Sequence, residues 1–440
     1  MRVEIERLRS ELEGVKAELR RLGTTSRPVL VASTAPLALR VETEPPLAEA
    51  AQDEPGALTP EEMLPLLQAQ VQELARTKVE SNSKFPVRLF GTIASNTFMN
   101  TGEPNWLDIG NVVAPTPAGL PAGSFSSSLR QTRIGALLDG PQIGSLKTGG
   151  VVALDFFGGS PNFQTGQVQA LPRLLYAYMR METPRTAIEI GHDHVMLAPR
   201  NPTSLAGMAF PILFRSGNLY LRAPQIRVER VLASGGAGEL RAIGGIVAPV
   251  GGDFSTAAYL FVPPNLAGER SRWPGVESRV SWRAVPPGPY EEPAWEVAAS
   301  GHYSRERYAS GLVPSWAGSV DFDATAGRIG VAGEVFAGRN IDAFGASLAQ
   351  VAKSWGGFVE VRLAATRRLD VNTGYGRDRL YDLQRFPGTL LQNASVFGNT
   401  IYQLTPEVGL SFEYRWLETT PRVGSRRKNH HYNFTAAYSF

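Results

Sequence analysis

Few residues of this 440-residue chain are spaced as catalysis or metal binding would require. His192 and His194 flank Asp193, a spacing that places both imidazoles on one face of a strand, where they could hold a metal ion or act as a base. We find neither a third ligand nor a nucleophile motif to accompany them. The chain has no cysteine, which removes thiolate nucleophiles, disulfides and cysteine-based zinc sites. We therefore expect no catalytic residue, no metal and no cofactor, and interpret these histidines and the pair His430–His431 as polar residues at strand ends or in surface loops.

Arginine carries most of the remaining chemistry, because it far outnumbers lysine and its forked guanidinium recognises carboxylates. Genomic base composition would explain the same excess. The chain has 44 Lys and Arg residues against 41 Asp and Glu residues, so its net charge of +3 does not indicate a nucleic-acid partner. What the arginines can do therefore depends on the elements that position them.

From Lys84 to Phe440 the sequence reads as about 16 segments of alternating polar and apolar residues, separated by clusters of Gly, Pro, Asn and Asp. This pattern is typical of an all-β sheet with many hairpins. We find no stretch of roughly 18 apolar residues, the length that a transmembrane helix needs. A closed barrel needs only alternate residues to be apolar, so a membrane-spanning barrel remains compatible with the mean hydropathy of -0.14.

The last segment, His431–Phe440, gives the clearest division between two faces. Aromatic residues alternate with polar ones, and the chain ends on Tyr438, Ser439 and Phe440. A terminal Phe on such a strand resembles the signal by which outer-membrane barrels are recognised for assembly, although the last strand of a soluble sandwich could alternate in the same way. Similar alternation in Trp295–Tyr303 and Glu407–Trp416, with aromatics near the segment ends, favours a transmembrane antiparallel β-barrel with a solvated interior.

The alternation also predicts which charged residues face the interior of the barrel. They are Glu189, Arg227, Glu229, Glu239, Arg241, Arg279, Arg283, Glu296, Arg328, Glu334, Glu360, Arg362, Glu413 and Arg415. A lining with both signs orients dipolar or charged solutes without binding them tightly. We therefore expect a porin for the passive diffusion of small polar solutes, with outer-membrane lipid and lipopolysaccharide around it.

The stretch from Val195 to Ala223 does not alternate, and a loop of that length inside a barrel usually has a function. We expect it to fold inward and narrow the pore, with Arg200, Arg215 and Arg222 at the constriction. The alternative is an external loop or a contact between subunits.

The N-terminal region has a different organisation. Residues 1–23 form a predicted coiled coil, residues 24–58 a Pro-rich linker, and residues 59–82 a second helix that begins at Thr59 and Pro60. The coiled-coil seam consists of Ile5, Leu8, Leu12, Val15, Leu19 and Leu22. A single amphipathic helix lying on the barrel is the alternative. The sequence opens without the apolar core of a secretory signal peptide, so we expect the true start of the precursor to lie upstream.

Several short runs resemble the DcaP-like outer-membrane porins. They are Arg133-Ile134-Gly135-Ala136, Gly144 to Thr148, Leu154 to Gly158, Arg173 to Tyr178, and Arg222 to Arg227. The resemblance covers most of residues 85–440. It implies a homotrimer of 16-stranded barrels with a periplasmic coiled-coil extension, passing small anions such as dicarboxylates. Among the family's binding residues, it carries over only Arg173, Arg222 and Arg227.

Two other functions remain open. An envelope tether, in which the coiled coil fixes the barrel to the cell wall, is compatible with a pore. A hydrolase embedded in the barrel is less favoured, because we find no nucleophile motif.

Overall fold

The computed structural model describes residues 86–159, 170–251, 266–285, 292–346, 351–381 and 390–440. The predictions for residues 1–23, 24–58 and 59–82, including the coiled-coil seam, lie outside these residues. No helix within them is long and apolar enough to cross a membrane.

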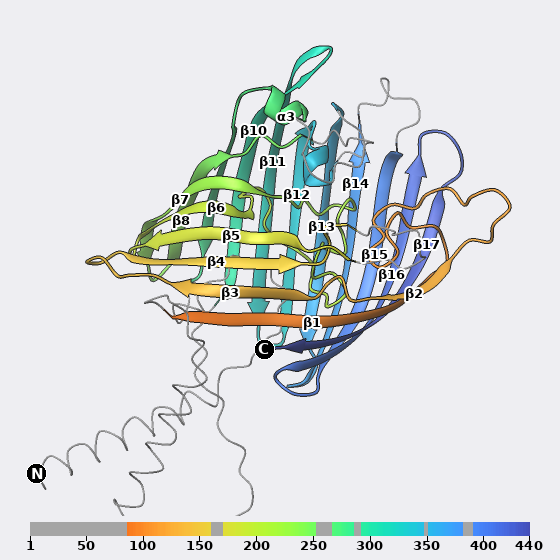
Figure 1. Ribbon diagram of the computed structural model, residues 1–440, viewed down its shortest axis with the longest axis horizontal. Helices are drawn as coiled ribbons and strands as arrows, with labels where there is room; N and C mark the ends of the chain where they lie inside the picture. The colour runs from red at the N-terminus through yellow and green to blue at the C-terminus, as the bar shows by residue number, and fades with distance from the viewer. Residues whose placement is uncertain (1–85, 160–169, 252–265, 286–291, 347–350, 382–389) are drawn as a thin grey trace, which may run out of the picture.

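The described chain is built almost entirely from antiparallel strands (Figure 1). The strands are β1 (Val87–Asn100), β2 (Ser124–Ser128), β3 (Arg133–Asp139), β4 (Lys147–Asp155), β5 (Arg173–Glu182), β6 (Thr186–His194), β7 (Arg222–Gly235), β8 (Gly238–Val247), β9 (Gly275–Arg283), β10 (Trp295–Tyr308), β11 (Gly311–Ala326), β12 (Ile329–Arg339), β13 (Lys353–Ala364), β14 (Leu369–Leu380), β15 (Leu390–Gln403), β16 (Val408–Pro421) and β17 (Arg427–Ser439). A short helix, α3 (Ala267–Arg270), and a 3-10 turn, η1 (Asp342–Phe344), lie in the connections.

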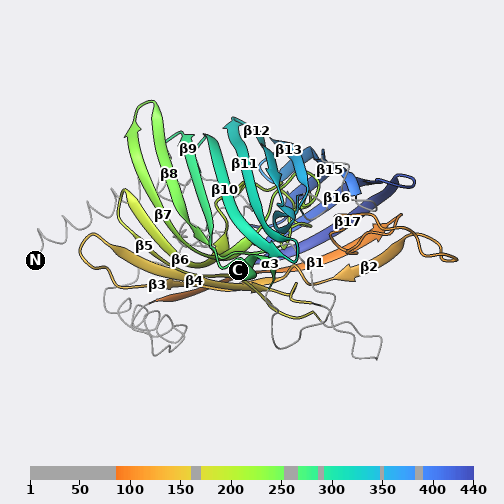
Figure 2. The same cartoon turned by 90° about the horizontal axis from the view of Figure 1, so that it is seen from above.

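The sheet closes on itself through β1. One edge of β1 pairs with β17, from Thr92 opposite Ser439 to Asn100 opposite His431. Its other edge pairs first with β3 and then with β2, so these two segments occupy one position in the barrel. The result is a closed 16-stranded antiparallel barrel, as predicted (Figure 2). Because the last strand pairs with the first, the alternative of a two-sheet soluble sandwich is wrong.

The barrel has its apolar side chains outside and its polar ones inside. On β17, Phe434 and Tyr438 are 49% and 46% exposed, whereas His431 and Asn433 are each 1% exposed. The predicted outward aromatic stripe is therefore confirmed. It ends at Phe440, whose backbone exchanges two hydrogen bonds with Gly91 of β1 at 2.9 and 3.0 Å. A surface of this kind suits hydrocarbon and not water.

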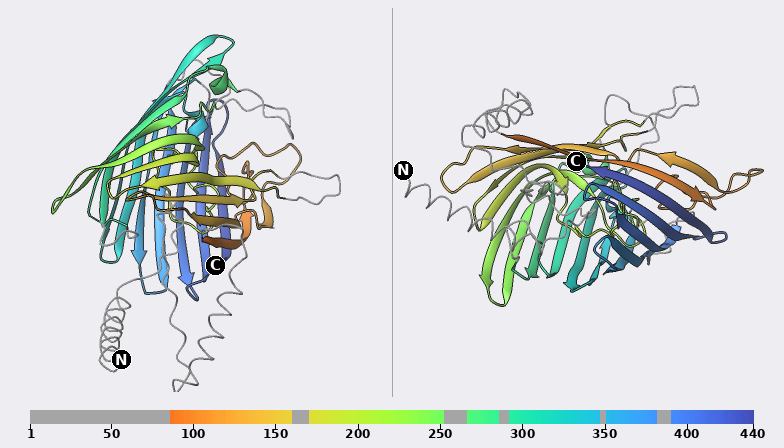
Figure 3. Two further views of the ribbon diagram at one scale, coloured as in Figure 1. Left: turned by 60° about the vertical axis from the view of Figure 1, so that its left-hand side comes forward. Right: turned by 90° about the horizontal axis from the view of Figure 1, so that it is seen from below.

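The two ends of the barrel differ. At the end where β17 finishes, the connections are short, such as the turn of residues 327–328 between β11 and β12 (Figure 3, left). The opposite end has the long connections, including residues 101–123 and 195–221. Outer-membrane barrels have short periplasmic turns and longer extracellular loops, so this asymmetry sets the orientation used below.

Candidate functional site: the barrel interior and the segment that crosses it

The segment Val195–Leu221, here called the inner segment, lies inside the barrel and not outside it. Arg173 of β5 donates a hydrogen bond to the carbonyl of Ala209 at 3.2 Å. From the other side, Arg415 of β16 donates one to the carbonyl of Ile212 at 2.6 Å. In Figure 2 its yellow-green coil runs within the ring of strands. The predicted inward fold is what the structure shows, although the segment ends at Leu221 because β7 begins at Arg222.

Two buried glutamates hold the ends of the inner segment. Glu277 of β9 accepts hydrogen bonds from the backbone amides of Met196 and Leu197 at 2.6 and 3.0 Å. Glu334 of β12 accepts one from the amide of Leu219 at 2.7 Å. Buried carboxyl oxygens need hydrogen-bond partners, and here the backbone amides of the segment supply them. These two side chains therefore anchor the segment to the wall.

Two more glutamates hold its middle. Glu360 of β13 accepts from the amide of Thr203 at 2.8 Å. Glu413 of β16 accepts from the hydroxyl of Ser204 at 2.5 Å, and Asn399 donates to the same carboxylate at 3.2 Å. The sequence predicted that Glu334, Glu360 and Glu413 face inward, and the structure places them there as anchors of the inner segment.

Glycines let the segment lie directly on the wall. At Gly217, with a φ of +97°, an added Cβ would lie 2.0 Å from the carbonyl oxygen of Gly357. At Gly376 of β14 an added Cβ would lie 2.1 Å from the carbonyl oxygen of Ser216. Neither position admits a side chain without moving the backbone.

Most of the predicted interior arginines are engaged with carboxylates. Arg227 lies 2.9 Å from Glu189 and 3.0 Å from Asp193, and all three are buried. Glu229 is the third carboxylate of this cluster and pairs with Arg180 at 3.0 Å. The cluster therefore forms part of the barrel wall, with its acids largely out of solvent.

A second group of ion pairs connects side chains of strands β8, β9, β10, β11 and β13. Arg279 pairs with Asp321, and Arg200 of the inner segment reaches the same carboxylate at 3.0 Å and Glu296 at 2.6 Å. Further pairs in this group are Arg241 and Arg283, each with Glu239, and Arg362 with Asp323. Burial alone would lower the pKa of Arg200. The carboxylates of Glu296, Asp321 and Asp323 outweigh that effect and raise the pKa of Arg200 above its ordinary value.

Two of the predicted arginines, Arg328 and Arg215, form no ion pair with a carboxylate of the described residues. Arg328 lies exposed in the turn after β11, where it donates to the carbonyl of Ala365, so its prediction as a lining residue is wrong. Arg215 lies on the inner segment beside the ring of Phe214, at 5.7 Å. Burial lowers the pKa of Arg215, and it forms no ion pair with the described part of the chain.

Arg133 and Arg222 face the interior without an ion pair to any carboxylate of the described residues. Arg222 lies over the rings of Tyr176 and Tyr220, at 4.8 and 5.0 Å, and donates to the hydroxyl of Tyr176 at 3.2 Å. Arg133 interacts electrostatically with Tyr176 and Arg222, and two of its nitrogens have no hydrogen-bond partner among the described residues. Neither arginine has a carboxylate within ion-pair distance in the described ranges, and both are half-buried. We call Arg133, Arg222, Tyr176 and Tyr220 the cationic cluster.

Sequence reasoning did not select Arg133 and Glu277 as site residues. The alternation that placed Arg279 inward also places Glu277 inward, two residues earlier on β9. Arg133 likewise shares the inward face of β3 with Leu137, whereas Ile134 and Leu138 are outward and exposed. The signal was therefore present in both strands.

The histidines do not form a metal site. No three His, Asp or Glu side chains converge as metal ligands anywhere in the described ranges. His194 is buried edge-on against Tyr220 at 5.0 Å, and His431 is buried inside β17 beside Asn100 at 2.8 Å. His194 ends β6, as the strand-end prediction has it, whereas the interpretation of His431 as a surface residue is wrong; His430 does face outward and contacts Tyr414.

One trio has the order of a hydrolytic triad. Ser304 lies 2.9 Å from Nε2 of His302, whose Nδ1 lies 2.9 Å from Glu277. Ser304 is 5% exposed, and Glu277 also holds the amides of the inner segment. The ring of His302 packs edge-on against Phe344 at 4.7 Å. The trio is therefore largely out of solvent, and its glutamate supports the inner segment.

Comparison with known proteins places this fold among porins. The outer membrane channel DcaP of Acinetobacter baumannii is similar in structure, with a TM-score of 0.64, 15% identity, and 82% of this chain and 99% of that chain covered. An anion-selective porin from Comamonas acidovorans has a TM-score of 0.55 at 11% identity, covering 81% and 100%. Salmonella typhi OmpF, in complex with daunomycin, has 0.54 at 13% identity, covering 82% and 99%.

No family model matches the sequence, and no curated protein is similar to it at the level of sequence. The chain has the porin fold. The resemblance to DcaP-like porins inferred from the sequence is confirmed for that fold.

Proposed function

We propose that this protein is an outer-membrane channel through which small polar solutes diffuse passively, with a preference for anions such as dicarboxylates. A closed barrel with an apolar outer surface and a charged interior suits a membrane channel. The inner segment crosses that interior and narrows the passage. The single observation that carries the anion preference is the cationic cluster, because its two arginines have no carboxylate partner among the described residues.

The size of the preference follows from Coulomb's law. Two unit charges about 6 Å apart, at an effective dielectric constant of about 40, interact by roughly 1.4 kcal/mol, or about tenfold in local anion concentration. Salt reduces this value. Two arginines side by side would favour a solute with two carboxylates over one with a single carboxylate, because each guanidinium can take one of them.

Planar bilayer recordings under a salt gradient test the proposal. We expect channel steps from the inserted protein and a reversal potential that indicates anion preference. Arg133→Gln and Arg222→Gln should each reduce the anion-to-cation permeability ratio several-fold, and succinate should compete with chloride current more strongly than acetate does. The matched control is Arg328→Gln, which removes the same charge from an exposed turn. Absence of channel steps would overturn the channel, and unchanged selectivity in both variants would overturn the role of the cluster.

We further propose that the chain forms a homotrimer with its N-terminal region in the periplasm. The seam spacing in residues 1–23 supports this proposal, since three heptads associate only when a second surface helps to hold the subunits together. An envelope tether is the second role for this region. Deleting residues 1–82 distinguishes the two, because loss of trimers indicates assembly, whereas loss of envelope integrity with intact trimers indicates tethering.

A further inference from the structure

A second group of arginines lies on the outer surface of the barrel wall. Strand register places Trp355, Arg379, Gln392 and Thr420 in one row across β13, β14, β15 and β16. This row faces outward, because Trp355 is 45% exposed whereas Asp378, which precedes Arg379, is 2% exposed.

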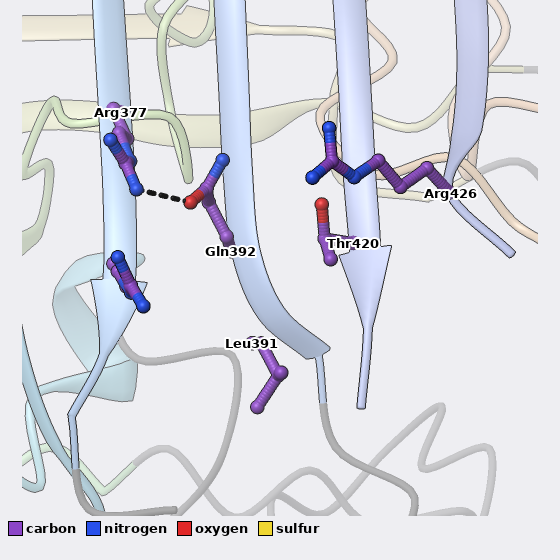
Figure 4. A pocket seen from close by; sticks show the side chains of 6 residues that line it. Arg377, Leu391, Gln392, Thr420 and Arg426 are labelled. Carbon is purple, nitrogen blue, oxygen red and sulfur yellow. Dashed lines mark hydrogen bonds between the residues drawn. The ribbon is translucent and has the colours of Figure 1, made fainter. Parts of the chain in front are cut away.

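The row forms the edge of a small pocket. Arg377 lies two residues before Arg379, nearer the middle of β14. It donates a hydrogen bond to Gln392, and its guanidinium lies 5.8 Å from the ring of Trp355. Arg426 reaches in from the connection between β16 and β17. Figure 4 shows the side chains of Arg377, Gln392, Thr420 and Arg426 turned toward one another. The lining residues, which also include Arg379 and Leu391, enclose about 250 Å³.

The pocket has unused hydrogen-bond donors and little negative charge. Nε of Arg377 and Oγ1 of Thr420 are buried and have no hydrogen-bond partner among the described residues. Glu418 is the carboxylate nearby, and it pairs with Arg426 at 3.5 Å. Arg377 and Arg379 have no carboxylate within ion-pair distance in the part of the chain that the structure describes. Such a set of donors suits an anion with several oxygens.

The position of the pocket indicates what carries that anion. The next outward row toward the middle of the barrel contains Arg377, Ala394 and Glu418. The row beyond it contains Tyr375 and Val396, which are 42% and 38% exposed, and Trp416. Aromatic rings of this kind lie at the boundary between hydrocarbon and headgroups. The pocket is at the end of the barrel with the long connections, which is the extracellular end. It therefore lies at the headgroup level of the outer leaflet.

We propose that this pocket binds a phosphate group on the headgroup of lipopolysaccharide, the lipid of the outer leaflet. The guanidiniums of Arg377, Arg379 and Arg426 bind the phosphate oxygens, and the hydroxyl of Thr420 donates a further hydrogen bond. The acyl chains run down over Val396 and the neighbouring apolar rows. This assignment rests on the outer-membrane location in the proposed function and does not depend on conduction.

The test is a binding titration of the purified full-length protein in detergent with fluorescent lipopolysaccharide. Arg377→Gln combined with Arg379→Gln should weaken binding at least tenfold, whereas Arg230→Gln combined with Arg328→Gln, both exposed near the short turns, should leave it unchanged. Thr420→Val should weaken binding several-fold, and keeps the assignment testable if the double variant fails to fold. Dephosphorylated lipid should bind as weakly as the double variant does.

Four outcomes would overturn the assignment. Equal affinity of the double variant and the wild type would show that the pocket is not the site. Equal affinity for dephosphorylated lipid would show that the pocket does not bind the phosphate group. Full competition by millimolar inorganic phosphate would indicate that the ligand is a free anion and not a lipid. A change of oligomeric state without a change in lipid affinity would make this face a contact between subunits. Channel conductance of the double variant should remain that of the wild type, so a failure here is distinguishable from failure of the proposed channel.

Discussion

Replacing Glu277 with alanine should loosen the inner segment. The carboxylate accepts two backbone hydrogen bonds, from the amides of Met196 and Leu197. Hydrogen bonds to a charged group contribute about 1.5 to 3 kcal/mol each, so two of them hold the segment by roughly 3 to 6 kcal/mol. At about 1.4 kcal/mol per factor of ten, local opening should become about a hundredfold to ten-thousandfold more frequent.

The opening should remain partial, because Glu334, Glu360 and Glu413 still hold other parts of the segment. We therefore expect single channels with more current noise and a somewhat larger conductance. Glu277→Gln retains an acceptor oxygen but loses the charge, so its effect should lie between those of the wild type and Glu277→Ala.

Single-channel recording in planar bilayers measures both quantities. Glu407→Ala is the matched control, because Glu407 lies exposed in the turn before β16 and contacts only Thr405 among the hydrogen bonds of its side chain in the described ranges. Each variant should first show the heat-dependent gel shift of a folded barrel. A folded Glu277→Ala channel with wild-type noise and conductance would refute the anchoring role.

Three further predictions follow from the same structure. Arg227→Ala leaves Asp193 buried without its arginine partner and Glu189 with Arg180 alone, at 3.4 Å, so the free energy of unfolding in urea should fall by about 3 to 5 kcal/mol. Deleting Phe440 removes its two backbone bonds to Gly91 and should lower the yield of membrane-inserted barrel, measured by fractionation; an unchanged yield would contradict its role as an assembly signal. Deleting residues 1–23 should reduce the fraction of trimers in native mass spectrometry, and intact trimers would contradict the predicted coiled-coil seam.

The barrel was predictable because its signal is local. Alternation along one strand assigns Tyr438 to the outside and His431 to the inside without any knowledge of the partner strands. Alternation does not specify where a strand stops, and for this reason Arg328 was placed on the wall although it lies in a turn. It also cannot show that β2 and β3 share one position opposite β1.

The sequence predicted that the inner segment lies inside the barrel, but it did not predict which wall residues bind it. Its length and its irregular pattern indicated that it enters the barrel. The wall glutamates hold it mostly through its backbone amides, which carry no signal in the sequence. Glu277 accepts a hydrogen bond from the amide of Met196, which lies 81 positions away in the sequence. The two groups meet because the barrel closes around the segment.

A charged side chain affects a passing solute in proportion to how far it is unpaired and in contact with solvent. A close ion pair acts at a distance as a dipole, whose field decays faster than that of a single charge, and a buried carboxylate adds little to the field in the water-filled space. Glu189 and Asp193 are 1% and 0% exposed and share Arg227, so the acidic half of the predicted lining mostly serves the wall. Arg133 and Arg222 have no such partner in the described ranges; each residue is half-buried, with Nε and Nη2 of Arg133 and Nε of Arg222 out of solvent. The proposed anion preference of a lining that contains both signs depends on this difference in pairing.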